Sequence, residues 1–508
     1  MSRLRNNILA NLAGQSWSAV LGLICAPLYI RFLGIEFYGL VGFYGMLQGV
    51  FSMLDFGLSP TINRELARYS TQPEKSSEAR NMVRTLEVVY WTTGVVLGTL
   101  LLLASPVIAT HWLKTQEIQV QTLQRVVMIM GLGTALQWPL NLYRGGLLGL
   151  QKHVVLNSLD AAMATLRSGG AVLILWLVSP TILAFFTWQS LVGALQCAVA
   201  VLLLWRLLPR SDAAPRVVWG LLRRVWRFAA GMSVTSLVSL LGSQFDRVLL
   251  SNLLNMQMFG YYTLARSVGD ALRVLSSPVF TALFPHLSAL VARGDEQGLR
   301  RTYHASCQLV AVMTLPAAVV VSLFSRELLQ LWTHSDIIAR FAAPVASILV
   351  IGTALNALAG FPYDVQIAHG WTRLAVYKNI VAVVVLGPLT VFLATHYGVV
   401  GAALVWLILN CGYVLIEVPI MHTRLLRGEM WRWYREDVGL PLAVTLGVAG
   451  AGRLVVPQSL GPLHTAVAVG VVWLATLMVC AAAAPYTRDW SLNQIVKLKA
   501  ACEIRRAS

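Results

Sequence analysis

The sequence predicts an all-α integral membrane protein with about fourteen transmembrane helices. Of its 508 residues, 57% are hydrophobic and only 12% are charged, whereas soluble domains carry about 25% charged residues. The mean hydropathy is +0.67. Apolar runs of about 20 residues, long enough to cross ~30 Å of hydrocarbon, recur along the whole chain. Because no stretch alternates with period two, a membrane β-barrel is excluded.

The apolar runs define the predicted spans in order. Pro278 and Pro285 are candidate breaks in the eighth of them. The spans are 8–30, 38–60, 83–104, 123–149, 154–178, 181–205, 228–252, 260–292, 305–325, 343–368, 374–394, 399–421, 438–456 and 463–485.

The distribution of basic residues predicts the orientation. The segments on one side of the predicted spans hold 28 of the 39 Lys and Arg residues, and those on the other side hold five. By the positive-inside rule, both termini are expected in the cytoplasm. The basic residues flank the spans, so membrane lipids with anionic headgroups are the expected partners, and nucleic acid is not.

The remaining six basic residues lie inside predicted spans. Burying each arginine at mid-membrane costs about 2.5–3.5 kcal/mol on insertion scales. Snorkelling to the interface explains the two that lie near helix ends, Arg125 and Arg144. It does not explain Arg167 or Arg273, which lie deep in the fifth and eighth spans. The full set is Arg125, Arg144, Arg167, Arg247, Arg266 and Arg273.

Three charges of the eighth span share one face. Steps of four and seven residues along a helix return to within about 40° of the start, which aligns Arg266, Asp270 and Arg273. One interpretation is structural ion pairing, here and between Asp160 and Arg167. The other is a cationic, water-filled cavity, which we favour because the stripe carries two arginines for one carboxylate.

Sequence patterns for catalysis are missing. The six cysteines are scattered without a Cys-x-x-Cys, and the nine histidines include no pair at metal-ligand spacing. No glycine-rich phosphate loop or catalytic triad pattern occurs. We therefore expect no enzyme activity, no catalytic residue, no metal and no cofactor. Transport would draw on an H⁺ or Na⁺ gradient or on the substrate gradient.

The two halves of the chain resemble each other. Tyr38-Gly39 and Phe259-Gly260 lie 221 residues apart, and Ser59-Pro60 and Ser277-Pro278 lie 218 apart. A repeat of six spans returns in the same orientation, which predicts two six-helix lobes related by a pseudo-two-fold axis along the membrane normal. The predicted parts are an N-terminal lobe (1–210), a cytoplasmic amphipathic linker (211–227), a C-terminal lobe (228–425), and two extra C-terminal helices with a basic cytoplasmic tail (426–508).

Two motifs carry a family resemblance. "APLYIRFLGIEFYGLVGFYGMLQGVFSMLDFGL" near the N-terminus, and "SQFDRVLLSNLLNMQMFGYYTLA" followed by "ALFPHLSAL", resemble the polysaccharide-flippase (Wzx-like) branch of the MOP (multidrug/oligosaccharidyl-lipid/polysaccharide) exporter superfamily. The resemblance implies a two-lobe transporter that works by alternating access. Its substrate would be an undecaprenyl-pyrophosphate-linked oligosaccharide of O-antigen, capsule or exopolysaccharide, moved from the inner to the outer leaflet. A polysaccharide polymerase and assembly proteins would be its partners.

An anionic pyrophosphate gives the membrane arginines a function, because a guanidinium stays charged and offers a planar donor fork. Arg31, within "YIRFLG", matches a basic position of the family motif. The candidate substrate-binding residues are Arg31, Arg167, Arg247, Arg266 and Arg273. The candidate charge partners or coupling sites, for which structural roles are equally open, are Asp55, Asp160, Asp246, Asp270 and Glu417.

Three alternatives stay open. A lipid II flippase of the same superfamily would fit the count of fourteen spans. A MATE-like drug or cation antiporter would need a cavity dominated by carboxylates, which the mid-membrane arginines disfavour. A membrane glycosyltransferase or O-antigen polymerase usually carries a large periplasmic loop, and the loops predicted on that side are short.

Overall fold

The computed structural model describes residues 2–55, 57–70, 72–223, 244, 246–457 and 461–488. Within these ranges every regular element is a helix, and one isolated bridge joins Lys114 to Asn255. The predicted all-α fold is therefore confirmed. The chain divides into two compact units, Met1–Thr263 (unit 1) and Leu264–Ser508 (unit 2), and each is described by itself.

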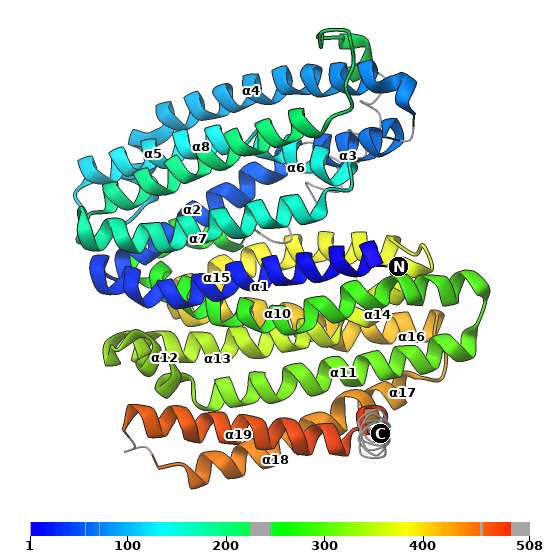
Figure 1. Ribbon diagram of the computed structural model, residues 1–508. Coiled ribbons are helices and arrows are strands. Elements are labelled where there is room, and N and C mark those ends of the chain that lie inside the picture. Colours follow the sequence, from blue (N-terminus) through cyan, green and yellow to red (C-terminus); the bar gives the residue numbers. More distant parts are fainter. Residues whose placement is uncertain are drawn as a thin grey trace, which may run out of the picture. The chain divides into compact units, whose positions relative to one another are not determined.

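Unit 1 is built from long helices that pack in pairs. Within it, α4, α5 and α8 run side by side, and α1 packs along α7 (Figure 1). The Tyr29 hydroxyl of α1 donates to the Ser168 carbonyl of α7 at 3.0 Å. The elements are α1 (Ser2–Leu33), α2 (Ile35–Met53), α3 (Leu58–Tyr69), η1 (Pro73–Lys75), α4 (Ser76–Val107), η2 (Ile108–Trp112), α5 (Val120–Gln137), α6 (Leu140–Gly149), α7 (His153–Leu177) and α8 (Ile182–Leu207).

Two helical breaks fall at glycines that have left-handed backbone. α2 and α3 meet at a bend of 53°, where Gly57 has a φ of +70°. Helix α15 is likewise interrupted at Gly398, with a φ of +58°. Left-handed backbone of this kind suits glycine because it has no Cβ. The break at Gly398 lies where the sequence predicts that one span ends at 394 and the next begins at 399.

Helix α10 (Met256–Arg293) begins in unit 1 and continues into unit 2. It runs through Pro278 and Pro285 as a single helix, so neither candidate break is present. The predicted lobe limits at 210 and 228 remain a prediction. Of the predicted linker 211–227, residues 224–227 lie outside the described residues.

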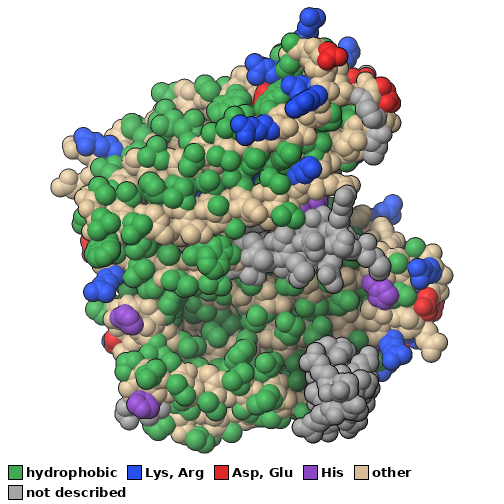
Figure 2. All heavy atoms as spheres, in the orientation of Figure 1, with side chains coloured by type: hydrophobic (Ala, Val, Ile, Leu, Met, Phe, Trp, Pro, Cys, Tyr) green, Lys and Arg blue, Asp and Glu red, His purple; other side chains and the backbone are tan. Residues whose placement is uncertain are grey.

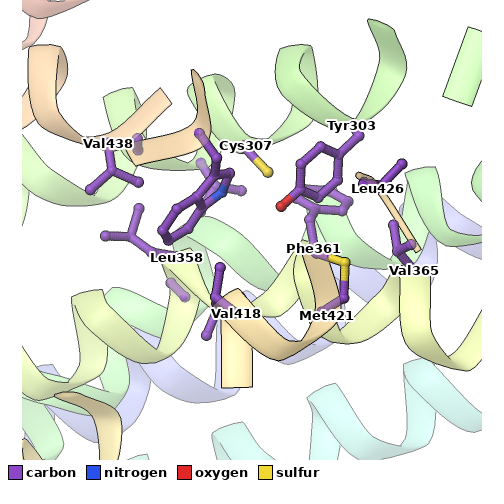
Figure 3. Packing of buried hydrophobic residues seen from close by; sticks show 14 of the residues in the cluster. Tyr303, Cys307, Leu358, Phe361, Val365, Val418, Met421, Leu426 and Val438 are labelled. Atoms are coloured by element: carbon purple, nitrogen blue, oxygen red, sulfur yellow. The ribbon is translucent and has the colours of Figure 1, made fainter. Parts of the chain in front are cut away.

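Unit 2 contains the rest of the helices. In Figure 3, side chains of α11, α14, α16 and the η4 segment converge on one core that includes Tyr303, Phe361 and Met421. The elements after α10 are α11 (Glu296–Leu323), α12 (Ser325–Thr333), α13 (Asp336–Leu358), α14 (Gly360–Ala368), α15 (Arg373–Gly412), η3 (Tyr413–Glu417), α16 (Val418–Arg424), α17 (Met430–Arg432), η4 (Trp433–Gly439), α18 (Leu440–Val455) and α19 (Pro462–Ala483). The last two helices pair with each other and pack on α11.

The surface fits a multi-pass membrane protein. Hydrophobic side chains cover much of the visible flank of each unit, while Lys and Arg side chains lie mainly towards its ends (Figure 2). By length and hydropathy, nine helices of the described chain can cross a membrane, or ten if the bent pair α2–α3 is one span. The total of fourteen and the pseudo-two-fold symmetry remain predictions. Most of the predicted span 228–252 and the tail beyond 488 lie outside the described residues.

Candidate functional site

A chain of polar contacts links α6, α7 and α8 inside unit 1. The Arg144 Nη2 lies 2.5 Å from Asp160 Oδ1. The Gln196 side-chain amide donates to the same Asp160 oxygen at 2.8 Å and accepts from Arg167 Nη2 at 2.9 Å. Gln196 is therefore a neutral bridge between the carboxylate and the second arginine.

The network continues through Gln137 at the end of α5. Arg167 Nη2 also lies 3.5 Å from Gln137 Oε1. The Gln137 amide nitrogen donates to the Tyr44 hydroxyl at 3.2 Å, and Gln48 donates to Gln137 Oε1 at 3.3 Å. Gly193 of α8 leaves room for this amide, because a Cβ there would lie 2.0 Å from Gln137 Nε2.

Arg167 differs from an arginine held in a salt bridge. In the described part of the chain its hydrogen bonds go only to the two glutamine oxygens, and it forms no ion pair with a carboxylate. Its Nε is buried without a hydrogen-bond partner there, as is the Nε of Arg144. Buried donors that lack partners are costly, so this site has unused capacity to bind an acceptor.

The two arginines border open space. A cavity of about 590 Å³ and a smaller one of about 190 Å³ both reach Arg144, Arg167 and Gln196. The larger cavity is lined by Ser18, Arg144, Asn157, Asp160, Ala164, Arg167, Ser168 and Gln196. Two guanidinium groups and one carboxylate leave the site with a formal charge of +1. It is therefore suited to an anion whose remainder offers hydroxyl or carbonyl groups to the amides.

Unit 2 holds the second predicted arginine cluster. Arg266 Nε lies 3.8 Å from Asp270 Oδ2, and the guanidinium carbons of Arg266 and Arg273 lie 5.4 Å and 5.6 Å from the centre of the Trp406 ring. The predicted stripe is therefore a real cluster on α10, and Trp406 of α15 attracts both cations through its ring face. This shared aromatic partner explains how two arginines lie close together with one carboxylate.

Amide side chains extend this cluster too. Arg273 Nη2 lies 3.4 Å from Asn356 Oδ1 of α13, and the Asn356 amide donates to Asn410 Oδ1 of α15 at 2.8 Å. The Trp406 indole N–H donates to Thr353 Oγ1 at 3.2 Å, which fixes the ring under the arginines. The cluster described in each unit thus combines two arginines and one aspartate with neutral amide side chains.

The other predicted binding residues lie elsewhere. Arg31 is exposed in the last turn of α1. Arg247 is partly buried, and its neighbour Asp246 accepts from the Tyr262 hydroxyl at 3.3 Å. We also predict from the sequence that Arg31, Arg167, Arg266 and Arg273 line one shared cavity.

Two of the carboxylates have defined partners. Asp55 is buried, accepts the Ser59 backbone N–H at 2.8 Å and bonds the Tyr90 hydroxyl, so it holds the first turn of α3. Asp160 pairs with Arg144 and not with Arg167, its neighbour on the same helix. Arg144, for which the sequence predicts snorkelling, instead turns towards α7 because Asp160 offers it a carboxylate.

Glu417 also has a partner, Lys378, which lies near the start of the predicted span 374–394. The ammonium of Lys378 lies 2.7 Å and 2.8 Å from the two carboxylate oxygens of Glu417. The same ammonium lies 4.5 Å from the ring centres of Tyr363 and Tyr413. With side-chain exposures of 17% for Lys378 and 4% for Glu417, this is a buried ion pair inside an aromatic cage.

The neutral residues of both clusters are not among the predicted site residues, because glutamine, asparagine and tryptophan inside a span are less conspicuous than charged residues. A polar amide inside an apolar span is itself a detectable pattern, because burying an amide costs free energy unless it is hydrogen-bonded. The residues missed in this way are Gln137, Gln196, Asn356, Trp406 and Asn410.

Comparison with known proteins agrees with the fold. A relative from Shigella flexneri, named "Putative O-antigen transporter", is 22% identical over 417 residues, which cover 80% of this chain and 94% of the relative. The solved structure of the lipid II flippase MurJ in an inward closed conformation has a TM-score of 0.75 at 11% identity, covering 95% of this chain and 99% of that one. An inward-facing multidrug resistance MATE family transporter of the MOP superfamily has a TM-score of 0.57 at 15% identity, covering 82% and 96%. At these identities the structural likeness shows the fold alone.

Two family models match the sequence. The MatE model matches residues 232–393, and the model of polysaccharide biosynthesis proteins matches residues 4–291, which is more than half of the chain. These matches confirm the resemblance to the MOP superfamily that the two motifs carry. The chain therefore belongs to the polysaccharide biosynthesis protein family.

Proposed function

We propose that this protein is a flippase that moves an undecaprenyl-pyrophosphate-linked oligosaccharide from the inner to the outer leaflet of the bacterial cytoplasmic membrane. The oligosaccharide would be a repeat unit of O-antigen, capsule or exopolysaccharide. The family and the name of the Shigella flexneri relative support a lipid-linked polysaccharide as the substrate class. The protein acts as a transporter and not as an enzyme.

One observation carries the proposal: Arg167 lines a cavity without a carboxylate partner in the described chain. A substrate phosphate could take the donors that Arg167 and Arg144 leave unused, and guanidinium groups match phosphate oxygens with two donors at once. Binding the anion would also neutralise the formal charge of +1 that the site keeps when empty. A cationic drug would instead meet net repulsion at both arginine clusters.

The amides support the glycan part of the proposal. Gln196, Gln137 and Asn157 border the two cavities of unit 1, and each amide both donates and accepts hydrogen bonds. Sugar hydroxyls do the same. Arginines would hold the pyrophosphate, while the amides exchange their present hydrogen bonds for bonds to the sugars as the substrate enters.

In alternating access, the loaded site would open first to the inner leaflet and then to the outer leaflet. An H⁺ or Na⁺ gradient or the substrate gradient would drive this change. We propose cytoplasmic termini, because the basic segments that the sequence places on one side belong inside. A polysaccharide polymerase and assembly proteins would receive the product on the outer face.

Purified protein in liposomes tests the proposal directly. The liposomes contain a fluorescent undecaprenyl-pyrophosphate oligosaccharide in both leaflets, and a membrane-impermeant quencher reports how fast lipid crosses. We expect wild-type protein to accelerate crossing and Arg167→Ala to lose most of it, since one charge-assisted contact is worth about 1.5–3 kcal/mol, or about tenfold to a hundredfold. Arg167→Lys should retain part of the rate, because the charge stays while the two-donor fork is lost.

Arg125→Ala is the matched control, since Arg125 is an exposed arginine of α5 that lines neither cavity. A second set of liposomes with lipid II tests the alternative flippase. Faster crossing of lipid II than of the oligosaccharide would assign the protein to that substrate. Equal rates for wild type, Arg167→Ala and protein-free liposomes with both lipids would contradict the flippase.

A further inference from the structure

A second polar cluster of unit 2 lies apart from the arginines and has a hydrogen-bonding pattern that ordinary protonation states cannot satisfy. His304 of α11 is completely buried. Its Nδ1 lies 2.5 Å from Asp437 Oδ2 of the η4 segment, and its Nε2 lies 3.0 Å from Glu429 Oε2 just before α17. Both ring nitrogens therefore face carboxylate oxygens.

Counting donors shows that a proton is needed. A neutral imidazole carries hydrogen on one nitrogen, and its other nitrogen is an acceptor. An ionised carboxylate only accepts. A neutral His304 between two ionised carboxylates would therefore place two lone pairs against each other at 2.5 Å or 3.0 Å, buried away from water. We infer that His304, Asp437 and Glu429 form a proton-binding site, with His304 held as an imidazolium between the two carboxylates.

The other oxygen of each carboxylate already has a donor. The Gln308 amide donates to the other Asp437 oxygen at 3.0 Å, and Arg300 Nη1 donates to the other Glu429 oxygen at 3.0 Å. Arg432 Nη1 lies 3.8 Å from Glu429 Oε2. The carboxylate oxygens that do not face His304 thus accept hydrogen bonds from groups that keep their hydrogens.

The remaining charged and titratable groups around the cluster do not supply the missing hydrogen. Arg300 and Arg432 also approach Glu296 and Glu436, and Arg432 donates to the Tyr486 hydroxyl. These groups belong to α11, α14, α16, α17, η4 and the segment after α19. Those in the described chain are Glu296, Arg300, Tyr303, Cys307, Asp364, His422, Arg432, Glu436 and Tyr486.

His422 provides an internal contrast in the same core. Its Nδ1 lies 2.9 Å from the Val418 carbonyl, which only accepts, so Nδ1 carries the hydrogen. Its Nε2 lies 3.2 Å from the Tyr303 hydroxyl, which can donate to it. A neutral ring satisfies both contacts. Two buried histidines of one core are therefore expected in different protonation states, because one faces two carboxylates and the other faces a carbonyl and a hydroxyl.

The bound proton ties separate elements together. Asp437 belongs to a π-helical segment, and such segments occur often at functional sites. The same segment leads into α18, which packs on α11 with α19. Loss of the proton would leave one of the two contacts between His304 and a carboxylate oxygen without a hydrogen atom. The lone pairs of the nitrogen and the oxygen would then repel each other, so residues 429–437 would have to move away from α11. Proton release and opening of this junction are thus linked events.

Nuclear magnetic resonance of the full chain, labelled with ¹⁵N-histidine in lipid nanodiscs, tests the site without any substrate. We expect one histidine to show hydrogen on both ring nitrogens at a pH at which His422 is neutral. That signal should vanish in His304→Gln. In Asp437→Asn the new amide can donate to Nδ1, so the ring needs no second hydrogen and should become neutral at the same pH.

Thermal unfolding across pH provides a second measurement, which does not need assigned signals. A folded state that binds one proton more than the unfolded state becomes less stable as pH rises, by about tenfold in the unfolding equilibrium per pH unit. We expect this slope in wild type and in His464→Gln, which replaces an exposed histidine, and a smaller slope in Asp437→Asn. A neutral His304 in wild type, or an imidazolium that persists in Asp437→Asn, would overturn the inference.

Discussion

Gly39 of α2 and Gly260 of α10 cross at backbone contact. A Cβ added to Gly39 would lie 2.2 Å from the Met256 carbonyl oxygen, and one added to Gly260 would lie 2.2 Å from the Ile35 carbonyl oxygen. Each glycine lies 221 residues from its counterpart, as Ile35 does from Met256. Within unit 1 the same close contact therefore occurs twice, with the partners exchanged.

We predict that alanine at either glycine destabilises the protein. Elsewhere in a helix, Gly→Ala stabilises by about 0.5–1 kcal/mol, because alanine loses less backbone freedom on folding. Gly39→Ala and Gly260→Ala should instead lower the midpoint of thermal unfolding in detergent, since the clash is with backbone that cannot rotate away. Gly22→Ala is the control, because nothing lies within 4 Å of its added Cβ.

The double variant sharpens this test. Once one methyl group has forced the helices apart, the second should add little, so the two effects should sum to less than their separate values. Unchanged midpoints in both single variants would mean that α2 and α10 do not cross closely.

We predict that Gln196→Glu blocks transport, and that it also lowers stability because a carboxylate replaces the amide that donates to Asp160 Oδ1. The new carboxylate would lie near Arg167 Nη2, which Gln196 now approaches to 2.9 Å, and would pair with it. The pair would remove the site's spare positive charge, so an anionic substrate would bind less tightly. Flipping in liposomes should fall about tenfold or more, in line with about 1.5–3 kcal/mol for a charged hydrogen bond. Transport at the wild-type rate would show that Arg167 does not bind the substrate.

We predict graded effects at the unit 2 cluster. Arg273→Ala removes charge and donors, so surface glycan should be lost while the amount of membrane-inserted protein stays normal. Arg273→Lys should retain partial glycan display, since the charge can still rest against Trp406. Asp270→Asn should be milder than either, because it frees an arginine and deletes none. The measurement is glycan display per molecule of inserted protein.

The opposite pattern would identify a purely structural cluster. In that case Asp270→Asn would lower protein amounts as much as Arg273→Ala, because each would remove contacts that hold the cluster together. Normal glycan display per remaining molecule in both variants would reject substrate binding at Arg273.

We predict that Lys378 and Glu417 stabilise the folded protein only as a pair. Glu417→Gln alone leaves the ammonium without its carboxylate, which should cost about 3–5 kcal/mol and lower the amount of folded protein. Replacing both residues, with Lys378→Met and Glu417→Gln, should restore much of the loss. If the double variant folds normally but no longer transports, Glu417 takes part in ion coupling; normal transport would assign the pair to structure alone.

We predict a cytoplasmic N-terminus and C-terminus. Reporter fusions after residues 115 and 333 should report the outside, and fusions after 72, 213 and 430 should report the cytoplasm. The physical reason is the asymmetry of basic residues between the two sides. A reversed pattern would contradict the orientation on which the direction of transport depends.

The sequence by itself determined the class of protein. The energy of placing apolar runs in lipid is a sum over neighbouring residues, so composition and run length were enough to predict membrane helices, including the break near Gly398. The depth of Arg167 and Arg273 within apolar runs also marked them as unusual, because a charge in hydrocarbon is costly wherever the rest of the fold lies.

Only the tertiary structure decided which groups meet. Asp160 and Arg167 share a face of α7, yet Asp160 pairs with Arg144 of α6, because packing brings that helix closer to the carboxylate. Lys378 and Glu417 belong to different predicted spans, yet the ammonium of Lys378 lies against the carboxylate of Glu417, 39 residues later. The amides around Arg167 come from α5 and α8, and the two carboxylates around His304 of α11 come from residues 429–437, 125 and 133 residues later. Hydrogen bonds act over about 3 Å, so such contacts follow from the positions of whole helices and not from spacing along one of them.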